Sequence, residues 1–159
     1  MKKLIVANWK MNIPDLKLWR SFRAPRNVDV VICPPSPYLD GVSKLLRAQS
    51  LGLRASLGAQ DIFWEEGGAF TGEVSGKMLK GFGVTHVIIG HSERRKWLNE
   101  TDEMINKKVL AALKVRLKAI LCVGEPLIVR KKGIAAAKSF VKSQLTKDLA
   151  GISNLKSQI

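Results

Sequence analysis

The sequence predicts an α/β protein built on a parallel sheet. Two observations predict this class: short apolar runs recur along the chain, and a turn and a helix-compatible segment follow most of them. The runs are rich in Val, Ile and Leu without clean alternation, which is typical of strands buried on both faces. The pattern alone fits an open doubly wound sheet or a closed barrel. The predicted strands are residues 3–7, 28–33, 56–60, 86–90 and 118–123.

Helices are predicted between the strands. Ser36 is expected to cap one helix with Pro37 at its first position, and Thr101 and Asp102 are expected to start another. Residues 12–28 leave room only for a short helix, and residues 131–133 indicate a turn. The apolar faces of the last two helices are expected to hold Ile105, Val109, Ala112 and Leu113, and Ile134, Ala137, Val141, Leu145 and Leu149.

Composition favours one ordinary domain, which we expect to span 1-159. The chain has 159 residues and is 46% hydrophobic, enough for a real core. No apolar run approaches the roughly 20 residues of a membrane span, and the first residues lack a signal-peptide core, so we expect a cytoplasmic protein with no membrane partner. Cys33 and Cys122 are expected to be buried reduced thiols, and the Cys and His spacing predicts no metal site.

The net charge of +14 is spread along the chain. It is +7 in residues 1–60, −1 in residues 61–100 and +8 in residues 101–159. This excess fits nucleic acid, an anionic substrate, an acidic partner or simply a basic surface. A nucleic-acid-binding module stays a lesser alternative, because the sequence has neither a recognisable binding motif nor an aromatic-studded basic face.

The most informative stretch is VIIGHSERR at residues 87–95, where an apolar run passes through a glycine into His91, Ser92 and Glu93. It predicts a buried strand that presents a histidine at its carboxyl end. A second signature, ANWKMN at residues 7–12, follows the first strand. It is not a Gly-rich phosphate loop, which argues against a dinucleotide-binding fold.

Together these segments resemble the triosephosphate isomerase family. Five further matches follow in order: ICPP at 32–35, GAQD at 58–61, GGAFTGE at 67–73, NKKV at 106–109 and LCVGE at 121–125. The resemblance implies the (β/α)8 TIM barrel fold. Since a full barrel takes about 250 residues, we expect a partial barrel of about five or six βα units, the N-terminal portion of the fold.

The resemblance also implies a chemistry. The family interconverts glyceraldehyde 3-phosphate and dihydroxyacetone phosphate in glycolysis and gluconeogenesis, and no cofactor or metal is expected. His91 matches the family's neutral electrophilic histidine, an established example of this use of imidazole, and the start of a helix at Ser92 would disfavour an imidazolium. Lys10 matches the cation for the phosphate and the enediolate, Asn8 would hold Lys10 and bind substrate, and Glu93 would orient Lys10.

Each of these residues also has an ordinary structural interpretation. His91 would be a structural strand-end histidine, Lys10 a surface lysine, Asn8 a turn residue, and Glu93 a first-turn glutamate that stabilises its helix.

A homodimer is the further implication of the resemblance. Thr71 lies in the loop that, in the family, reaches the Asn-Lys-His cluster of a neighbouring subunit, and Phe70 and Trp64 are poor choices for a freely exposed loop. The alternative is a loop packed on its own barrel. Glu100 resembles a buried glutamate that supports the interface; otherwise it is a helix-end acid.

One departure concerns the catalytic base. In the family the base is a glutamate in a Tyr-Glu-Pro run that ends strand six; the sequence has no such run, and Gln158 and Ile159 fall about where that strand should begin. The family's lid and Gly-Gly phosphate site are also missing. We therefore expect a truncated, very poor isomerase, since a general base contributes about 10²–10⁴-fold, unless a complementing C-terminal chain supplies the rest. The alternative is a noncatalytic, self-associating barrel fragment.

A second departure concerns the backbone. Arg116 stands where the family commonly has a helix-ending glycine, so a positive φ is expected there.

Overall fold

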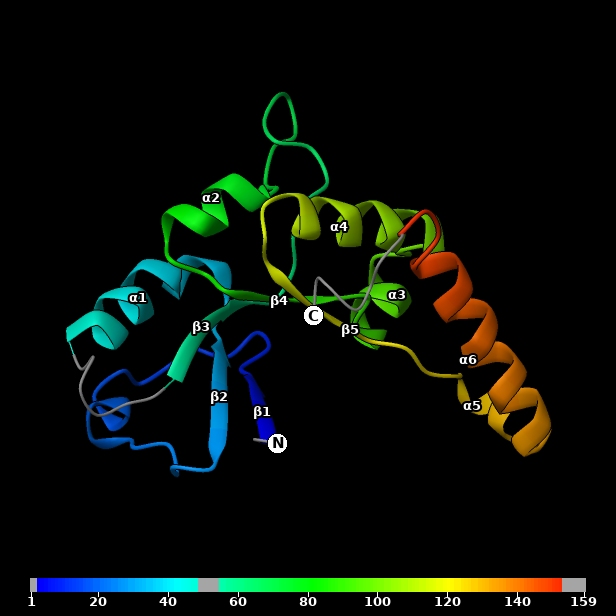
Figure 1. Cartoon of the computed structure of the whole chain (residues 1–159), viewed down its shortest axis with the longest axis horizontal. Coiled ribbons are helices and arrows are strands. Elements are labelled where there is room, and N and C mark those ends of the chain that lie inside the picture. Colours follow the sequence, from blue (N-terminus) through cyan, green and yellow to red (C-terminus); the bar gives the residue numbers. More distant parts are fainter. Residues whose placement is uncertain (1–2, 49–54, 153–159) are drawn as a thin grey trace.

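A computed structural model describes residues 3–48 and 55–152, apart from the side chain of Arg20. Its five strands are all parallel and follow one another in the order β1-β2-β3-β4-β5, which confirms a partial (β/α) barrel. Figure 1 shows the strands as a curved sheet with helices along its outer side. Gln158 and Ile159, about where strand six of the family should begin, lie outside the described residues. The strands are β1 (Lys3–Asn8), β2 (Val28–Cys33), β3 (Ala55–Ala59), β4 (His86–Ile89) and β5 (Lys118–Leu121).

The helices confirm most of the predicted pattern. Thr101 caps one of them, since its hydroxyl accepts the backbone N–H of Met104 at 3.3 Å. Lys131 and Lys132 lie in a turn and Arg116 has a φ of +57°, both as predicted. Two short helices, α2 and α5, are additional to the prediction. The helices are α1 (Leu39–Ala48), α2 (Gly76–Gly81), α3 (Ser92–Trp97), α4 (Asp102–Lys114), α5 (Leu127–Arg130) and α6 (Ile134–Asp148).

The segment between β1 and β2 contains only the short 3-10 helix Leu18–Ser21, as its length predicts. The start of the next helix was predicted wrongly: Ser36 lies inside a 3-10 turn, Ser36–Tyr38, and its side chain makes no capping hydrogen bond. The N-terminal flanking position is Pro35, because three prolines within four residues fix the extended backbone that leads into α1.

The predicted apolar face of α6 is only partly right. Ile134 is 67% exposed and Leu145 is 37% exposed, while Ala137, Gln144 and Asp148 are buried. The helix packs on α4 and α5, and the Gln144 side chain accepts the N–H of Gly124, in the segment after β5, at 2.9 Å. Spacing alone therefore predicts only part of the buried face of this helix.

β2 and β4 are buried on both faces of the sheet, and this explains their non-alternating sequences. In β2, Val30 and Ile32 contribute to the large core between the sheet and the outer helices, whereas Val31 and Cys33 face the inner side of the curve. Ile88 joins the inner cluster from β4. Because the strands are parallel, their carboxyl ends lie along the same edge of the curved sheet, and so do the loops that follow them.

The loop between β3 and α2 projects from the rest of the described chain, at the top of Figure 1. Its base is closed by pairing of Phe63 with Ser75, and the N–H of Phe63 donates to the carbonyl of Val74 at 2.9 Å. Beyond this base, residues 65–73 are exposed. Across residues 3–48 and 55–152, no helix is both long and apolar enough to cross a membrane.

Candidate active site

Two of the loops at the carboxyl ends of the strands bring the predicted site residues together. Lys10 follows β1 and Glu93 follows β4, 83 positions later, and the Lys10 Nζ donates to Glu93 Oε1 at 2.7 Å. Asn8 ends β1, and its side-chain oxygen accepts the backbone N–H of Lys10 at 2.9 Å. His91 lies beside Glu93, with Nδ1 at 3.4 Å from Glu93 Oε2.

Lys10 has an unusual backbone. Its φ is +51°, in the left-handed region that costs energy for any residue with a side chain. The Asn8 side chain, the Gln60 side chain and the neighbouring loop hold this conformation: Gln60 Nε2 donates to the carbonyl of Lys10 at 2.9 Å, and Asn12 Nδ2 donates to the carbonyl of Trp9 at 2.7 Å. Strain held in place by surrounding contacts is a feature of functional sites.

Gln60 is a site residue that the sequence analysis missed. Its Nε2 donates to two carbonyls, those of Lys10 and Cys33, both at 2.9 Å. It therefore ties the loop after β1 to the ends of β2 and β3. A signal was present, because a polar amide at the carboxyl end of a buried strand has few other roles.

A hydrogen bond to the His91 ring indicates which of its two nitrogens carries a hydrogen. His91 precedes α3, and its Nδ1 accepts the backbone N–H of Glu93 at 3.2 Å. A ring nitrogen that accepts an N–H carries no hydrogen, so this hydrogen bond corresponds to the tautomer with its hydrogen on Nε2. The ring is therefore a hydrogen-bond donor through Nε2, and its side chain is 23% exposed.

Glu93 is kept ionised beside this ring. The hydrogen bond from Lys10 holds the pKa of Glu93 below its usual range, with help from the charge of Lys10 and against slight desolvation. Both partners are about half exposed, so the pair adds little stability and acts mainly to orient Lys10. The site thus places the Lys10 ammonium and the His91 imidazole on either side of the Glu93 carboxylate.

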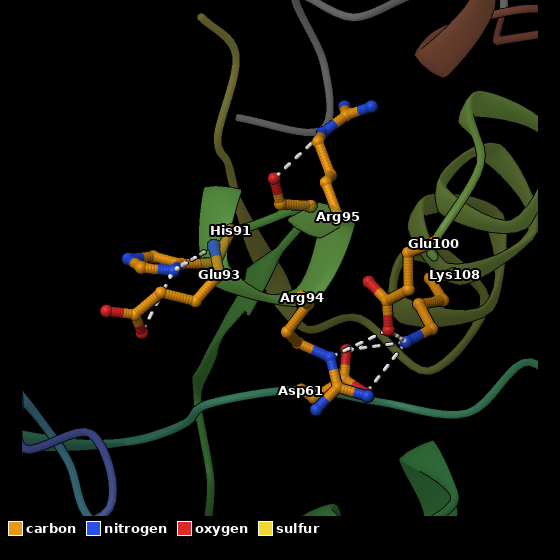
Figure 2. A network of polar contacts seen from close by, with 8 residues as sticks. Asp61, His91, Glu93, Arg94, Arg95, Glu100 and Lys108 are labelled. Atoms are coloured by element: carbon orange, nitrogen blue, oxygen red, sulfur yellow. Dashed lines mark hydrogen bonds and ion pairs between the residues drawn. The ribbon is translucent and has the colours of Figure 1, made fainter. Parts of the chain in front are cut away.

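Behind these side chains lies a network of four charged residues (Figure 2), namely Asp61, Arg94, Glu100 and Lys108. Lys108 on α4 is 2% exposed, donates to Asp61 Oδ2 at 2.7 Å and also contacts Glu100. Arg94 donates to the same two carboxylates, at 2.8 Å and 2.7 Å. The Glu100 carboxylate is therefore buried within the chain, with its Oε1 in contact with both cations.

The two carboxylates of this network respond differently. Burial raises the pKa of Asp61, and its contacts with Lys108 and Arg94 only partly oppose this. Burial acts in the same sense on Glu100, but hydrogen bonds and charges from Lys108 and Arg94 outweigh it and lower the pKa. The sequence analysis missed Lys108, although a lysine between Ile105 and Val109 on an apolar helix face is itself a signal of a buried pair.

Arg95 points to the opposite side of α3 from Arg94 (Figure 2). Its guanidinium donates to the carbonyl of Gly90 at 3.0 Å, to Asp102 Oδ1 at 2.6 Å and to Asp148 Oδ2 at 2.8 Å. Asp148 is fully buried, and burial raises its pKa to about 6, assisted by the negative charge of Asp102 and opposed by Arg95.

The remaining predicted residues lie apart from this cluster. Thr71 is exposed in the projecting loop, and Phe70 is 43% exposed with its ring centroid 4.9 Å from that of Phe63. A cavity of about 550 Å³ separates this loop from Lys10 and the proline-rich turn before α1. Its lining includes Lys10, Gln60 and Arg94 but not His91.

Both cysteines are free thiols on the inner side of the sheet. Burial raises the pKa of Cys33 to about 12 and also raises the pKa of Cys122, so neither is disposed to act as a nucleophile. Among the residues that the structure describes, no group of His, Cys, Asp or Glu has a metal-binding arrangement.

Parallel strands that converge on polar residues at their carboxyl ends place this chain among the (β/α) barrel proteins. The family model described as "Triosephosphate isomerase" matches residues 3–159. Curated relatives of that name are 45% identical in Alkaliphilus metalliredigens, over 95% of this chain and 61% of the relative, and 43% identical in Trichodesmium erythraeum, over 96% and 64%. The chain belongs to the triosephosphate isomerase family. It spans about three fifths of the length of these relatives.

The buried network predicts a large effect of Lys108→Met. This change would leave Asp61 and Glu100 with Arg94 as their shared cation, and breaking a buried pair costs about 3–5 kcal/mol. We expect a loss of that size in the free energy of unfolding, measured by urea titration. Lys114→Met is the matched control on the same helix: its pair with Glu66 is exposed, and we expect a change below about 0.5 kcal/mol. Equal losses in the two variants would contradict the buried pairing.

Asp148 predicts a pH-dependent difference in stability. With a raised pKa, the folded state holds a proton on Asp148 that the unfolded state releases, so the contribution of this carboxyl falls as pH rises from about 4 to 6. Asp148→Asn cannot ionise. We therefore expect the free energy of unfolding of the variant, relative to the natural chain, to rise by about 1–3 kcal/mol between pH 4 and pH 7.

Urea titrations at several pH values measure this difference. Asp40→Asn, which changes an exposed carboxylate, is the control and should differ from the natural chain by less than about 0.5 kcal/mol throughout. A difference for Asp148→Asn that stays constant across this range would refute the assignment.

Proposed function

We propose that this chain carries the electrophilic half of a triosephosphate isomerase active site and acts on triose phosphates. The observation that carries the proposal is the contact of Lys10 with Glu93 next to a histidine whose Nδ1 accepts a backbone N–H. This arrangement leaves His91 Nε2 to donate and Lys10 to supply a positive charge. The family membership supports the same assignment.

Isomerisation moves a proton between two neighbouring carbons, one of which bears the hydroxyl and the other the carbonyl oxygen. When a base removes the proton from carbon, negative charge develops on the carbonyl oxygen, and the His91 Nε2–H stabilises it by a hydrogen bond. Lys10 adds electrostatic stabilisation to this oxygen and attracts the phosphate. Asn8 contributes by fixing the backbone conformation of Lys10, since its side-chain oxygen accepts the Lys10 N–H at 2.9 Å.

The base itself is not among these residues. Glu93 lies closest to His91, but the hydrogen bond from Lys10 lowers its pKa and makes it a weak base. We propose that the base comes from a polypeptide segment outside residues 1–159, either a longer form of the chain or a complementing one. The greater length of the relatives is consistent with this.

A homodimer is the second part of the proposal. The projecting loop exposes Thr71 and Phe70, and the 550 Å³ cavity beside Lys10 has the dimensions of a ligand or side-chain pocket. Seating the loop of one copy in the cavity of the other would cover apolar surface on both and bring Thr71 near Lys10.

The exposed side of β1 supports an alternative function. Leu4 is 52% and Ile5 is 54% exposed on a strand that pairs with β2. Exposed apolar strand edges promote association, so copies of the chain could cover one another without catalysis. Stable oligomers without turnover would identify this case.

Complementation tests the proposed activity. The purified chain is mixed with the C-terminal two fifths of the Alkaliphilus metalliredigens relative, and isomerisation of glyceraldehyde 3-phosphate is measured. We expect activity only when both pieces are present. His91→Asn should reduce this activity by about 10²–10³-fold, because one donor to the developing oxyanion is lost.

Lys114→Met is the control in this assay and should be as active as the natural chain, since Lys114 is exposed on α4 far along the helix from the site. A complex that forms by native mass spectrometry and yet shows no turnover would contradict the proposed activity, and so would full activity of His91→Asn.

The dimer is tested by Thr71→Arg. Thr71 is exposed, so the chain should fold normally, but a long charged side chain would not seat beside Lys10 and Arg94 in the cavity. We expect the dimer dissociation constant to rise at least about tenfold, roughly 1.4 kcal/mol, in sedimentation velocity. Glu65→Arg, also exposed in this loop but outside the predicted contact, should leave it unchanged. Equal effects would point to a self-packed loop.

A further inference from the structure

We propose that Asp148, at the end of α6, is a positioning residue for His91, and that it acts through Arg95 on the turn at Gly90. The catalytic meaning of this inference rests on the proposed function, because it assumes that His91 is the electrophile. The geometry itself does not depend on that assumption.

Arg95 is the centre of the arrangement. Three acceptors from three parts of the chain hold its guanidinium: the Gly90 carbonyl at 3.0 Å, Asp102 at 2.6 Å and Asp148 at 2.8 Å. A guanidinium is planar and its donors have fixed directions, so two carboxylates on Nη1 and Nη2 define where Nε points. Nε is the donor that reaches Gly90.

Gly90 transmits this constraint to the histidine. Its φ is +74°, and a side chain there would lie 3.2 Å from the carbonyl of Cys122 and 3.3 Å from Arg95 Nη2, so the turn is both left-handed and crowded. The Gly90 carbonyl and the His91 nitrogen belong to one rigid peptide plane. Fixing that carbonyl therefore fixes the direction in which the backbone enters His91.

The ring of His91 is held at its other end by a weaker contact. Its Nδ1 accepts the Glu93 N–H at 3.2 Å, and no further hydrogen bond to the ring is present among the described residues. If the turn at Gly90 relaxes, this contact is the one that lengthens. The ring would then lose the N–H that keeps Nδ1 without a proton.

Burying the Asp148 carboxylate beside Arg95 lowers the stability of the fold, which argues for a role beyond packing. The Asp148 side chain is fully buried, and within the described residues Oδ1 has no hydrogen-bond partner. Burying a carboxylate with one oxygen unsatisfied costs stability even next to a cation. Asp102 alone would be a poorer anchor, because it is 19% exposed and also pairs with Lys147 at 3.3 Å.

The end of α6 is fixed by separate contacts. Asn106 on α4 donates from Nδ2 to the carbonyls of Asp148 and Ala150, at 3.0 Å and 2.9 Å. The charged and titratable groups around the pair are Arg95, Asp102, Lys147 and, beyond Arg95, Cys122. The position of α6 therefore constrains the turn before His91 through the guanidinium of Arg95.

Histidine NMR tests the proposal on the whole chain, because His86 and His91 are the only two histidines in the sequence. Burial, with the charge of Lys118, lowers the pKa of His86, which helps to separate the two titrations. In Asp148→Ala we expect the His91 midpoint to rise by about half a pH unit or more and the ring to gain Nδ1–H tautomer, as the Glu93 N–H contact weakens. His86 should not change.

Two further variants complete the design. Asp148→Asn keeps an acceptor for Arg95 and should restore most of the natural His91 titration. Arg95→Lys replaces the planar fork by a single ammonium and should shift His91 as Asp148→Ala does, which keeps the test available if Asp148→Ala does not fold. Asp40→Ala, an exposed carboxylate paired with Lys44 on α1, is the control and should change neither histidine.

The results separate positioning from general loosening. A folded Asp148→Ala or Arg95→Lys with unchanged His91 overturns the proposal, and so do equal shifts of His86 and His91. Because the readout needs no turnover, a shift of His91 in a chain that fails complementation would support the positioning role and count against the proposed function alone. In the complemented enzyme, we expect Asp148→Ala to lower kcat about tenfold with little change in KM; unchanged kcat would overturn the positioning role alone.

Discussion

The buried ammonium of Lys108 is the interaction on which the arrangement of this chain depends. It joins three segments that the sequence keeps apart: the turn after β3 through Asp61, the residues before α4 through Glu100, and α4 itself. Arg94 completes the charge balance with the same two carboxylates and lies one residue after Glu93. The half-exposed pair of Lys10 and Glu93 is therefore next to a buried network of two cations and two carboxylates, which limits the geometries that the weak surface ion pair can adopt.

Much of the fold follows from the sequence in physical terms. All five strands are visible as short apolar runs. The bounds of β2 are as predicted, and those of the other four differ from the prediction by one or two residues, as at Gln60, which follows β3 rather than ending it. Glycine at residue 90 and the polar residues that follow it mark a strand end that presents His91. Two local effects make this strand end predictable. A positive φ favours glycine at residue 90, and the apolar side chains before it are buried.

What the sequence could not predict depends on contacts between distant segments. The side of α6 that is buried is decided by polar partners in the segment after β5 and on α3, so Gln144 and Asp148 are buried while Ile134 is exposed. Ser36 does not cap the helix, because the neighbouring prolines fix the backbone conformation and place the N-cap position at Pro35. Lys108 and Gln60 each act through a partner about 50 positions away, and periodicity within one helix or strand carries no information about such a partner.

The two halves of the site differ in how they are attached to the rest of the molecule. β1 pairs only with β2 in the described sheet, and the loop that bears Lys10 is held by a few hydrogen bonds, one donated by the Gln60 side chain and one accepted by the Asn8 side chain. β4, by contrast, lies between β3 and β5, with α4 packed against it. A local opening of β1 would remove the cation and leave the histidine in place, so we expect faster amide exchange in β1 than in β4.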